Sequence, residues 1–189
     1  MADKLNILVI LGSVREGRIA LPVGRWVMAR GGGRADLNLE LVDPAEWDLP
    51  FYPHPKPPAA GNYQDPLQAR WGEKIASADG YVLICPEYNH SGSAVLKNAL
   101  DTVFAEWSRK PVSFVGYGSV GAARSIEQLR LTTIALEMAP LNSSVHLVRP
   151  GAKREGDRFN ADQYDDKALA ALFDELVWWG RTLKAGRQA

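Results

Sequence analysis

This sequence of 189 residues has one cysteine and three histidines, and it has no excess of charge of either sign. The one cysteine, Cys85, excludes an internal disulfide and a zinc site built on cysteines, and we interpret it as a core residue. The three histidines lack the spacing of metal ligands, so we expect no metal. Lysine plus arginine and aspartate plus glutamate number 22 each, which gives no electrostatic case for binding nucleic acid or an anionic membrane surface.

Long hydrophobic runs are also missing. No uncharged apolar stretch approaches the roughly 20 residues that span a bilayer. The apolar run Leu5–Leu11 is short, and no signal-peptide cleavage pattern follows it. Together with the low cysteine content, this predicts a soluble, cytoplasmic protein. Hydrophobic residues make up 46% and charged residues 23%, as in globular chains, and the length predicts a single domain, residues 1–189.

Four apolar runs and one alternating segment predict five β-strands. The apolar runs are nearly continuous, which is expected of strands that are covered on both faces, whereas alternation suits a more peripheral strand. The predicted strands are Leu5–Leu11, Gly80–Cys85, Pro111–Tyr117, the weaker Ser144–Val148 and the alternating Leu37–Val42.

Segments with helical periodicity separate these strands. We expect helices over Ile19–Arg30, with Pro22 in the first turn, and over Asp65–Ala78. Apolar residues at positions i, i+3, i+4 and i+7 indicate three further amphipathic helices. The side chains that we expect these helices to bury are Leu96, Ala99, Leu100 and Val103, then Leu131, Ile134, Ala135 and Met138, then Leu169, Leu172, Phe173 and Leu176.

The alternation of strands and helices predicts an α/β fold with a parallel sheet, right-handed crossovers and helices on both faces, which is a three-layer sandwich. Five strands favour the flavodoxin-like order 2-1-3-4-5. The segment Asp48–Pro66 contains six of the twelve prolines and is predicted to be a long extended loop. Because it lies between a strand and a helix, we interpret it as an active-site flap or a packing arm.

Three loops are candidates for a binding site, because ligands of an open parallel sheet bind beyond the carboxyl ends of its strands. The loop after the first strand, residues 12–18, contains Ser13, Arg15 and Arg18 and leads into a helix. A hydroxyl, two guanidinium groups and a helix N-terminus all donate to phosphate. The loop matches neither the Walker A motif nor G-x-G-x-x-G. An ordinary turn with solvated arginines is the alternative.

The loops after the third and fourth strands suit a flat heterocycle. Residues 86–91 read PEYNHS, and a rigid proline, an aromatic ring, an amide and a carboxylate are suitable neighbours of a ring edge. Residues 117–124 include two glycines, which let the backbone approach a planar ring. Each of these residues is also a common turn former, so a purely structural role remains open.

The sequences PEYNHS at residues 86–91 and AVLKNALD at residues 94–101 resemble the PEYN-x-S and LKNA-hydrophobic-D signature of the NADPH-dependent FMN reductase family. That family includes quinone, azo-dye and chromate reductases, and the resemblance extends over residues 6–148. It implies that Ser13, Arg15 and the loop as far as Ile19 hold the FMN phosphate. It also implies that Pro86, Glu87, Tyr88 and Asn89 border the isoalloxazine and ribityl groups, and that Tyr117, Gly118 and Ser119 close the other edge of the ring.

The resemblance implies an FMN-dependent oxidoreductase with NADPH or NADH as co-substrate and no catalytic side chain. Hydride passes to flavin N5, and a small-molecule acceptor (a quinone, flavin, azo compound or metal ion) then takes two electrons in a ping-pong cycle. A homodimer or a dimer of dimers is also implied. We expect the polar face of the third helix, which includes Lys97, Asn98 and Asp101, to meet solvent or another subunit.

Two departures from the family pattern affect these expectations. Arg18 and Ala20 stand where many relatives have serine and asparagine, so we leave open whether Arg18 contacts the FMN phosphate or an incoming nucleotide. Ala122 and Ala123 stand where relatives often have two glycines. Two other classes of protein remain as alternatives: a non-enzymatic, flavodoxin-type electron carrier, and a nucleotide-binding regulatory domain.

Overall fold

A five-stranded parallel sheet forms the centre of the computed structural model, which describes residues 4–189. The strands lie in the order β2-β1-β3-β4-β5, and every neighbouring pair is parallel. The predicted flavodoxin-like order is therefore confirmed. The strands are β1 (Leu5–Leu11), β2 (Leu37–Val42), β3 (Gly80–Pro86), β4 (Pro111–Gly118) and β5 (Ala139–Val148).

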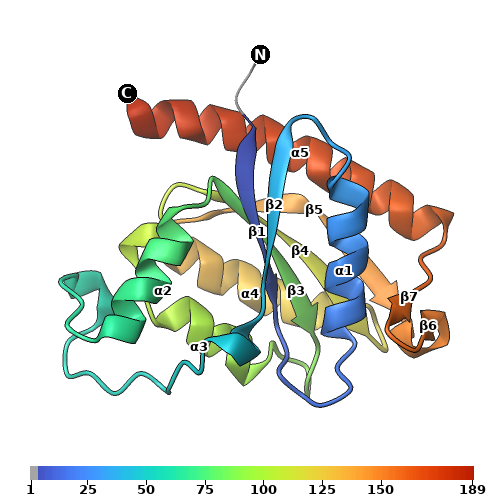
Figure 1. The fold of residues 1–189 in the computed structure, drawn as a ribbon, viewed down its shortest axis with the longest axis horizontal. Helices are drawn as coiled ribbons and strands as arrows, with labels where there is room; N and C mark the ends of the chain where they lie inside the picture. Colours follow the sequence, from blue (N-terminus) through green and yellow to red (C-terminus); the bar gives the residue numbers. More distant parts are fainter. Residues whose placement is uncertain (1–3) are drawn as a thin grey trace.

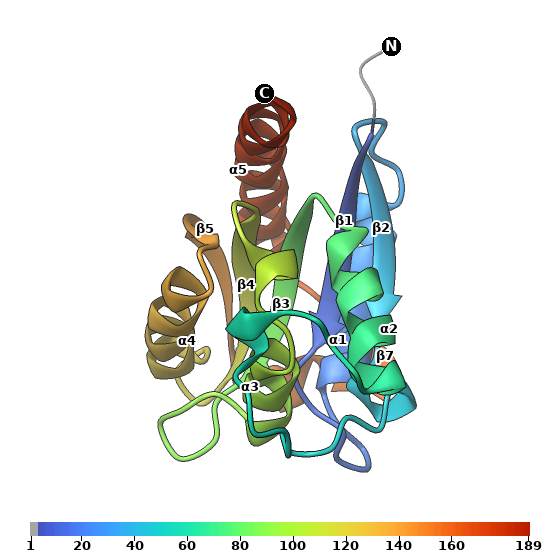
Figure 2. The ribbon, with the colours of Figure 1, turned by 90° about the vertical axis from the view of Figure 1, so that its left-hand side faces the viewer.

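Helices cover both faces of this sheet, as the sequence predicts (Figure 1). The α-helices are α1 (Ala20–Gly31), α2 (Pro66–Ala76), α3 (Ala94–Asp101), α4 (Ala123–Ala135) and α5 (Gln163–Gln188). Residues of α1 and α5 pack on one face, and residues of α2, α3 and α4 pack on the other. In Figure 2, α2 and α3 stand in front of the strands, and α5 is seen nearly end-on beside the upper ends of the strands. Short 3-10 helices are η1 (Pro44–Glu46), η2 (Pro58–Ala60), η3 (Ala105–Trp107) and η4 (Pro150–Lys153).

The position of β1 in the sheet explains why its sequence is continuously apolar. Ile7 and Val9 face the core beneath α1 and α5, whereas Leu8 and Ile10 face the core beneath α2, α3 and α4. All four side chains are buried. A central strand of a three-layer sandwich has no solvent face, so both sets of alternating positions are apolar.

The predicted buried face of α4 is wrong. Leu131 and Ile134 are 71% and 58% exposed, and α4 turns Ile126, Leu129 and Thr133 toward the sheet instead. The hydroxyl of Thr133 donates to the carbonyl of Arg130, which satisfies this buried polar group. The apolar spacing therefore identified the helix but assigned its outer surface to the core.

The start of the proline-rich segment Asp48–Pro66 is bonded to α3, whereas most of its other residues are exposed. Asn98 Nδ2 donates to the carbonyls of Leu49 and Pro50 at 3.1 and 3.0 Å. Farther along, the Tyr63 hydroxyl donates to Glu106 at 2.9 Å. The expectation that Asn98 faces solvent or another subunit is thus wrong, because its amide supplies hydrogen bonds to an arm that has little regular structure of its own.

The region after β5 holds elements that the sequence patterns did not reveal. A two-stranded antiparallel hairpin, β6 (Arg154–Glu155) and β7 (Arg158–Phe159), precedes α5 and lies beside the lower end of α1 in Figure 1. Helix α5 has 26 residues, and Lys184 and Arg187 near its end contact Asp79 at 2.9 and 3.4 Å. Within residues 4–189, neither α5 nor any other helix is long and apolar enough to cross a membrane.

Candidate functional site

Three hydroxyl groups meet where β1, β3 and β4 end. Ser13 Oγ and the Tyr88 hydroxyl share a hydrogen bond of 3.0 Å, and the Tyr117 hydroxyl lies beside both. Each comes from a different one of the three predicted loops. The chain leaves β1 toward α1 on one face and leaves β3 toward α3 on the other. In an open parallel sheet this divergence is where a ligand-binding crevice is expected.

A close backbone approach brings the first loop against β3. The Gly12 amide donates to the Ile84 carbonyl at 2.9 Å, and a Cβ atom on Gly12 would lie 2.4 Å from that oxygen. Ser93 Oγ donates to the Gly12 carbonyl at 2.6 Å and also caps the start of α3. Ser13 is consequently held in place and is 1% exposed. Only glycine permits this contact at position 12.

The Tyr117 hydroxyl is buried, and it makes no well-formed hydrogen bond among residues 4–189, although the Ser13 and Tyr88 hydroxyls lie next to it. Burial raises the pKa of Tyr117 well above its ordinary value, and the neighbouring Tyr88 adds to this rise. The group therefore stays protonated and can donate. A buried hydroxyl without a partner is costly, so a ligand or ordered water is its expected partner. This observation fits a cofactor in the crevice.

The start of α1 provides donors for an anion. No side chain caps the helix at Ile19, and its first turn has no acidic residue, so side chains do not compete for the first amide groups. Gly17, with φ of +64°, makes the turn that enters the helix. Arg15 is exposed, its Cζ atom lies 5.6 Å from the centroid of the Tyr88 ring, and no ion pair found within residues 4–189 involves it. These features fit a phosphate group.

Arg18 has a different environment from Arg15. Its guanidinium pairs with the Asp43 carboxylate just beyond β2, and the two side chains are only 16% and 13% exposed. Asp43 also accepts a hydrogen bond from the Ala45 amide at the start of η1. The charge of Arg18 is thus compensated within the protein. A contact between Arg18 and the FMN phosphate or a nucleotide stays a prediction.

The segment after β3 is a tight turn fixed to α4. Tyr88 and Ser91 exchange backbone hydrogen bonds of 2.9 and 3.0 Å, and Asn89 and His90 between them have φ of 50° and 69°. This conformation suits asparagine, which tolerates positive φ. Gln128 of α4 accepts from Ser91 Oγ and donates to the His90 carbonyl.

Glu87 anchors the same segment by charge. Its carboxylate accepts from Arg124 Nε at 2.6 Å and from the Arg124 amide at 3.2 Å. Burial alone would raise the pKa of Glu87, but the hydrogen bonds and charge of Arg124 lower it below its ordinary value overall. Arg124 also contacts His90 Nε2 at 2.9 Å. The Glu87 carboxylate is therefore committed to α4, and a contact with the flavin stays a prediction.

The remaining predicted residues lie around this crevice. The Pro86 carbonyl accepts from Ser125 Oγ at 3.0 Å, and the Gly118 carbonyl accepts from the Arg149 amide at 3.0 Å. Ser119 is exposed on the loop after β4. Ala122, at a position where relatives often have glycine, has φ of 58°, so this alanine occupies the left-handed conformation that glycine adopts more readily.

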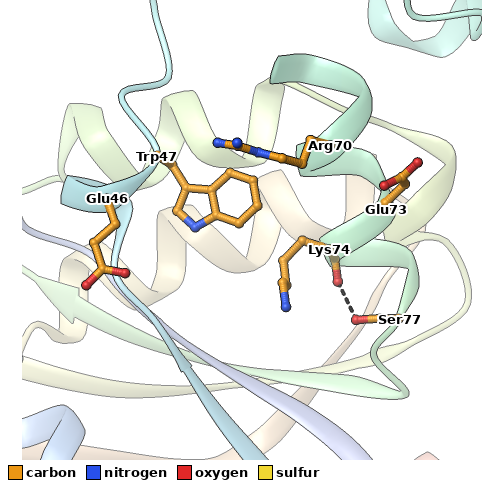
Figure 3. Close-up of a pocket in the computed structure, with 6 residues that line it drawn as sticks. All are labelled: Glu46, Trp47, Arg70, Glu73, Lys74 and Ser77. Carbon is orange, nitrogen blue, oxygen red and sulfur yellow. Dashed lines mark hydrogen bonds between the residues drawn. The ribbon is translucent and has the colours of Figure 1, made fainter. Parts of the chain in front are cut away.

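Two hollows differ in their distance from these loops: one adjoins the first loop and the other lies away from all three. A groove of about 490 Å³ lies beside the first loop, and its lining includes Val14, Leu49, Phe51 and Val95. Another hollow, of about 530 Å³, is drawn in Figure 3 and lies against α2, where Arg70 stacks over the Trp47 ring at 5.0 Å. The second hollow contains none of the predicted site residues, and four of its six lining side chains are charged.

Replacing Glu87 by Gln is expected to lower the free energy of unfolding by about 1–2 kcal/mol at pH 7, because charge-assisted hydrogen bonds are lost. The pKa of Glu87 is lowered on folding, so its contribution is complete above the ordinary value of 4.5 and is lost as pH falls through the lower folded value. Urea unfolding at several pH values measures this. Glu127→Gln, at an exposed site on α4, is the control; an equal loss at pH 3 and pH 7 would contradict the assignment.

Comparisons with known proteins identify the family of this chain. Residues 5–151 match the family described as NADPH-dependent FMN reductase. An NAD(P)H-dependent FMN reductase of Schizosaccharomyces pombe is 38% identical over 148 residues, which cover 76% of this chain and 74% of that protein. A quinone reductase of Escherichia coli is 30% identical over 148 residues, covering 75% and 76% of the two chains.

A solved structure supports the same fold. The flavoenzyme FerB of Paracoccus denitrificans, described as an NAD(P)H:(acceptor) oxidoreductase, has a TM-score of 0.75 and 23% sequence identity, covering 94% of this chain and 98% of that chain. At this identity the likeness concerns the fold. The match over residues 5–151 shows more: this chain belongs to the NADPH-dependent FMN reductase family and is an oxidoreductase enzyme.

Proposed function

We propose that this protein binds FMN in the crevice between the loops after β1, β3 and β4 and transfers electrons from NADPH or NADH to a small-molecule acceptor. The observation that carries the proposal is the convergence of Ser13, Tyr88 and Tyr117, in which the buried Tyr117 hydroxyl makes no well-formed hydrogen bond among the described residues. Membership of a reductase family favours an enzyme over a flavodoxin-type carrier.

In this proposal the start of α1 holds the phosphate. Arg15 supplies a positive charge, Ser13 supplies a hydroxyl, and the first amides of the helix supply backbone donors. The segment from Pro86 to Asn89 borders one edge of the ring system, and the segment from Tyr117 to Ser119 borders the other. When bound, FMN supplies the redox chemistry by accepting hydride and releasing two electrons. The protein orients the cofactor and stabilises its charge.

We further propose that the nicotinamide and the acceptor use one site in turn, in a ping-pong cycle. Three exposed apolar side chains, Val14, Phe51 and Val120, stand on segments beyond the carboxyl edge of the sheet. The groove beside Val14 and Phe51 suits the flat ring of a quinone, flavin or azo compound. Such side chains also suit contact with a second subunit, so a homodimer remains part of the proposal. The cytoplasmic location stays a prediction.

Steady-state kinetics of the purified protein test this function. We expect a yellow protein with a flavin absorption band that consumes NADPH or NADH only when an acceptor such as menadione, FMN or an azo dye is present. Varying nicotinamide against quinone is expected to give parallel double-reciprocal lines. A flavin-free protein that takes up no added FMN would contradict the cofactor site, and intersecting lines would contradict the ping-pong order.

Replacing Tyr117 by Phe separates cofactor binding from stability. The hydroxyl makes no well-formed hydrogen bond among residues 4–189, so its loss is expected to leave the free energy of unfolding of the FMN-free protein unchanged or higher. The dissociation constant for FMN is expected to rise by about 2- to 10-fold, equivalent to one neutral hydrogen bond. Quenching of flavin fluorescence measures the affinity. An unchanged constant would remove this hydroxyl from the site.

Replacing Arg15 by Ala is expected to raise the dissociation constant for FMN by about 10- to 100-fold, because a charge-assisted contact is lost. The control is Arg181→Ala, which removes the same charge from an exposed position on α5. Titrations at low and high salt should show a weaker salt dependence for the Arg15 variant than for the parent. If both variants behave alike, Arg15 has no specific role at the phosphate.

A further inference from the structure

The β6–β7 hairpin lies outside the region that matches the reductase family, which ends at residue 151. Arg154 pairs with Phe159, and Glu155 pairs with Arg158, across a turn in which Gly156 has φ of 56°. In Figure 1 the hairpin stands beside the end of α1 that follows the first loop. A segment from beyond the family match therefore reaches the proposed phosphate site.

The hairpin is anchored independently of that site. Phe159 is buried in the core beneath α1, and its ring centroid lies 5.4 Å from that of Trp26. Just before the hairpin, Lys153 contacts Asp162 and Asp165 at the start of α5, at 2.7 and 2.6 Å. An element fixed at both ends can hold a neighbouring loop in one conformation.

Arg154 makes the link to the first loop. Its Nε donates to the Gly156 carbonyl at 2.7 Å, and its Nη1 donates to the Gly17 carbonyl at 2.5 Å. One planar guanidinium thus joins the turn of the hairpin to the residue that turns the chain into α1. Gly156 is two residues from Arg154 in the sequence, whereas Gly17 is 137 residues away. The contact between Arg154 and Gly17 therefore forms only in the folded chain.

The contact completes a set of restraints on the first loop. The Ser13 hydroxyl is joined to Tyr88, and Arg18 is paired with Asp43 beyond β2. Among residues 4–189, no atom lies within 4 Å of the place where a Cβ of Gly17 would lie, so the space beside this residue is open. Arg154 restrains this turn through its carbonyl. A loop ordered before binding loses less conformational entropy when the ligand arrives.

We propose that Arg154 is a positioning residue for the cofactor: it holds the turn at Gly17 in the conformation that receives the FMN phosphate. This inference rests on the proposed function. Arginine suits the role because its planar group donates in two fixed directions, whereas the ammonium group of lysine is a point charge that does not reproduce the pair of contacts. The hairpin, which follows the matched residues 5–151, is then a part of the cofactor site.

Two variants and a matched control test the proposal. Arg154→Gln removes the charge and the two contacts, and Arg154→Lys keeps the charge. Arg158→Gln removes the same charge from an exposed position on the same hairpin. We expect Arg154→Gln and Arg154→Lys to raise the dissociation constant for FMN by about 10-fold or more, and Arg158→Gln to change it by less than about 2-fold. At saturating FMN, kcat should stay within 2-fold of the parent.

Amide hydrogen exchange of the FMN-free proteins supplies a readout that is independent of activity. Both Arg154 variants should exchange faster than the parent in residues 12–19 while the strands of the sheet remain protected, which also shows that the variants are folded. Parental affinity in Arg154→Gln, or retention of parental affinity by Arg154→Lys, would overturn the positioning role. If the parent itself binds no FMN, the proposed function fails; if the parent binds and the variants match it, only this inference fails.

Discussion

The divergence of the chain after β1 and β3 is the constraint on which the site depends. These strands are neighbours in the sheet, yet α1 packs on one face and α3 packs on the other. Their loops separate and leave a crevice at the carboxyl edge. Gly12 lets the first loop approach the backbone of β3. The two loops are therefore in close contact at Gly12 and diverge beyond it.

Two of the charged side chains on these loops are neutralised by ion pairs within the protein. Arg18 is compensated by Asp43, and Glu87 is compensated by Arg124, so these pairs shape the loops without adding net charge. Three further features of these loops are hydrogen-bond donors, namely Arg15, the protonated Tyr117 hydroxyl and the uncapped start of α1, whereas Glu16 adds an exposed carboxylate beside Arg15. The proposed preference for an anion therefore depends on these donors and not on the net charge of the chain, which is zero.

Much of the sheet was predictable because its signal is local. Continuous apolar runs identify β1, β3 and β4, their alternation with helices predicts a parallel sheet, and the number of strands favours the observed order. Sequence reasoning failed where tertiary contacts decide the outcome. Leu131 and Ile134 have core-like spacing but face outward, while polar Ser125 and Thr133 are buried because backbone carbonyls accept their hydrogen bonds.

In the candidate site, too, features with a local sequence signal were predictable and features that depend on tertiary contacts were not. The motif residues Ser13, Tyr88 and Tyr117 were identifiable, and the fold brings them together. Pairings over long sequence separations, such as Arg18 with Asp43 and Arg154 with Gly17, leave no local pattern, and the two-residue strands of the hairpin are too short to show a period. An arginine beyond β5 gave no signal by which its contact with the first loop could have been found.

Comparison of FMN with riboflavin tests the central claim most directly, because the two flavins differ by the phosphate alone. If the loop after β1 grips the phosphate, FMN should bind at least about 100-fold more tightly than riboflavin, since several charge-assisted contacts are involved. Flavin fluorescence titrations of the cofactor-free protein give both constants. Equal affinities for the two flavins would contradict the account.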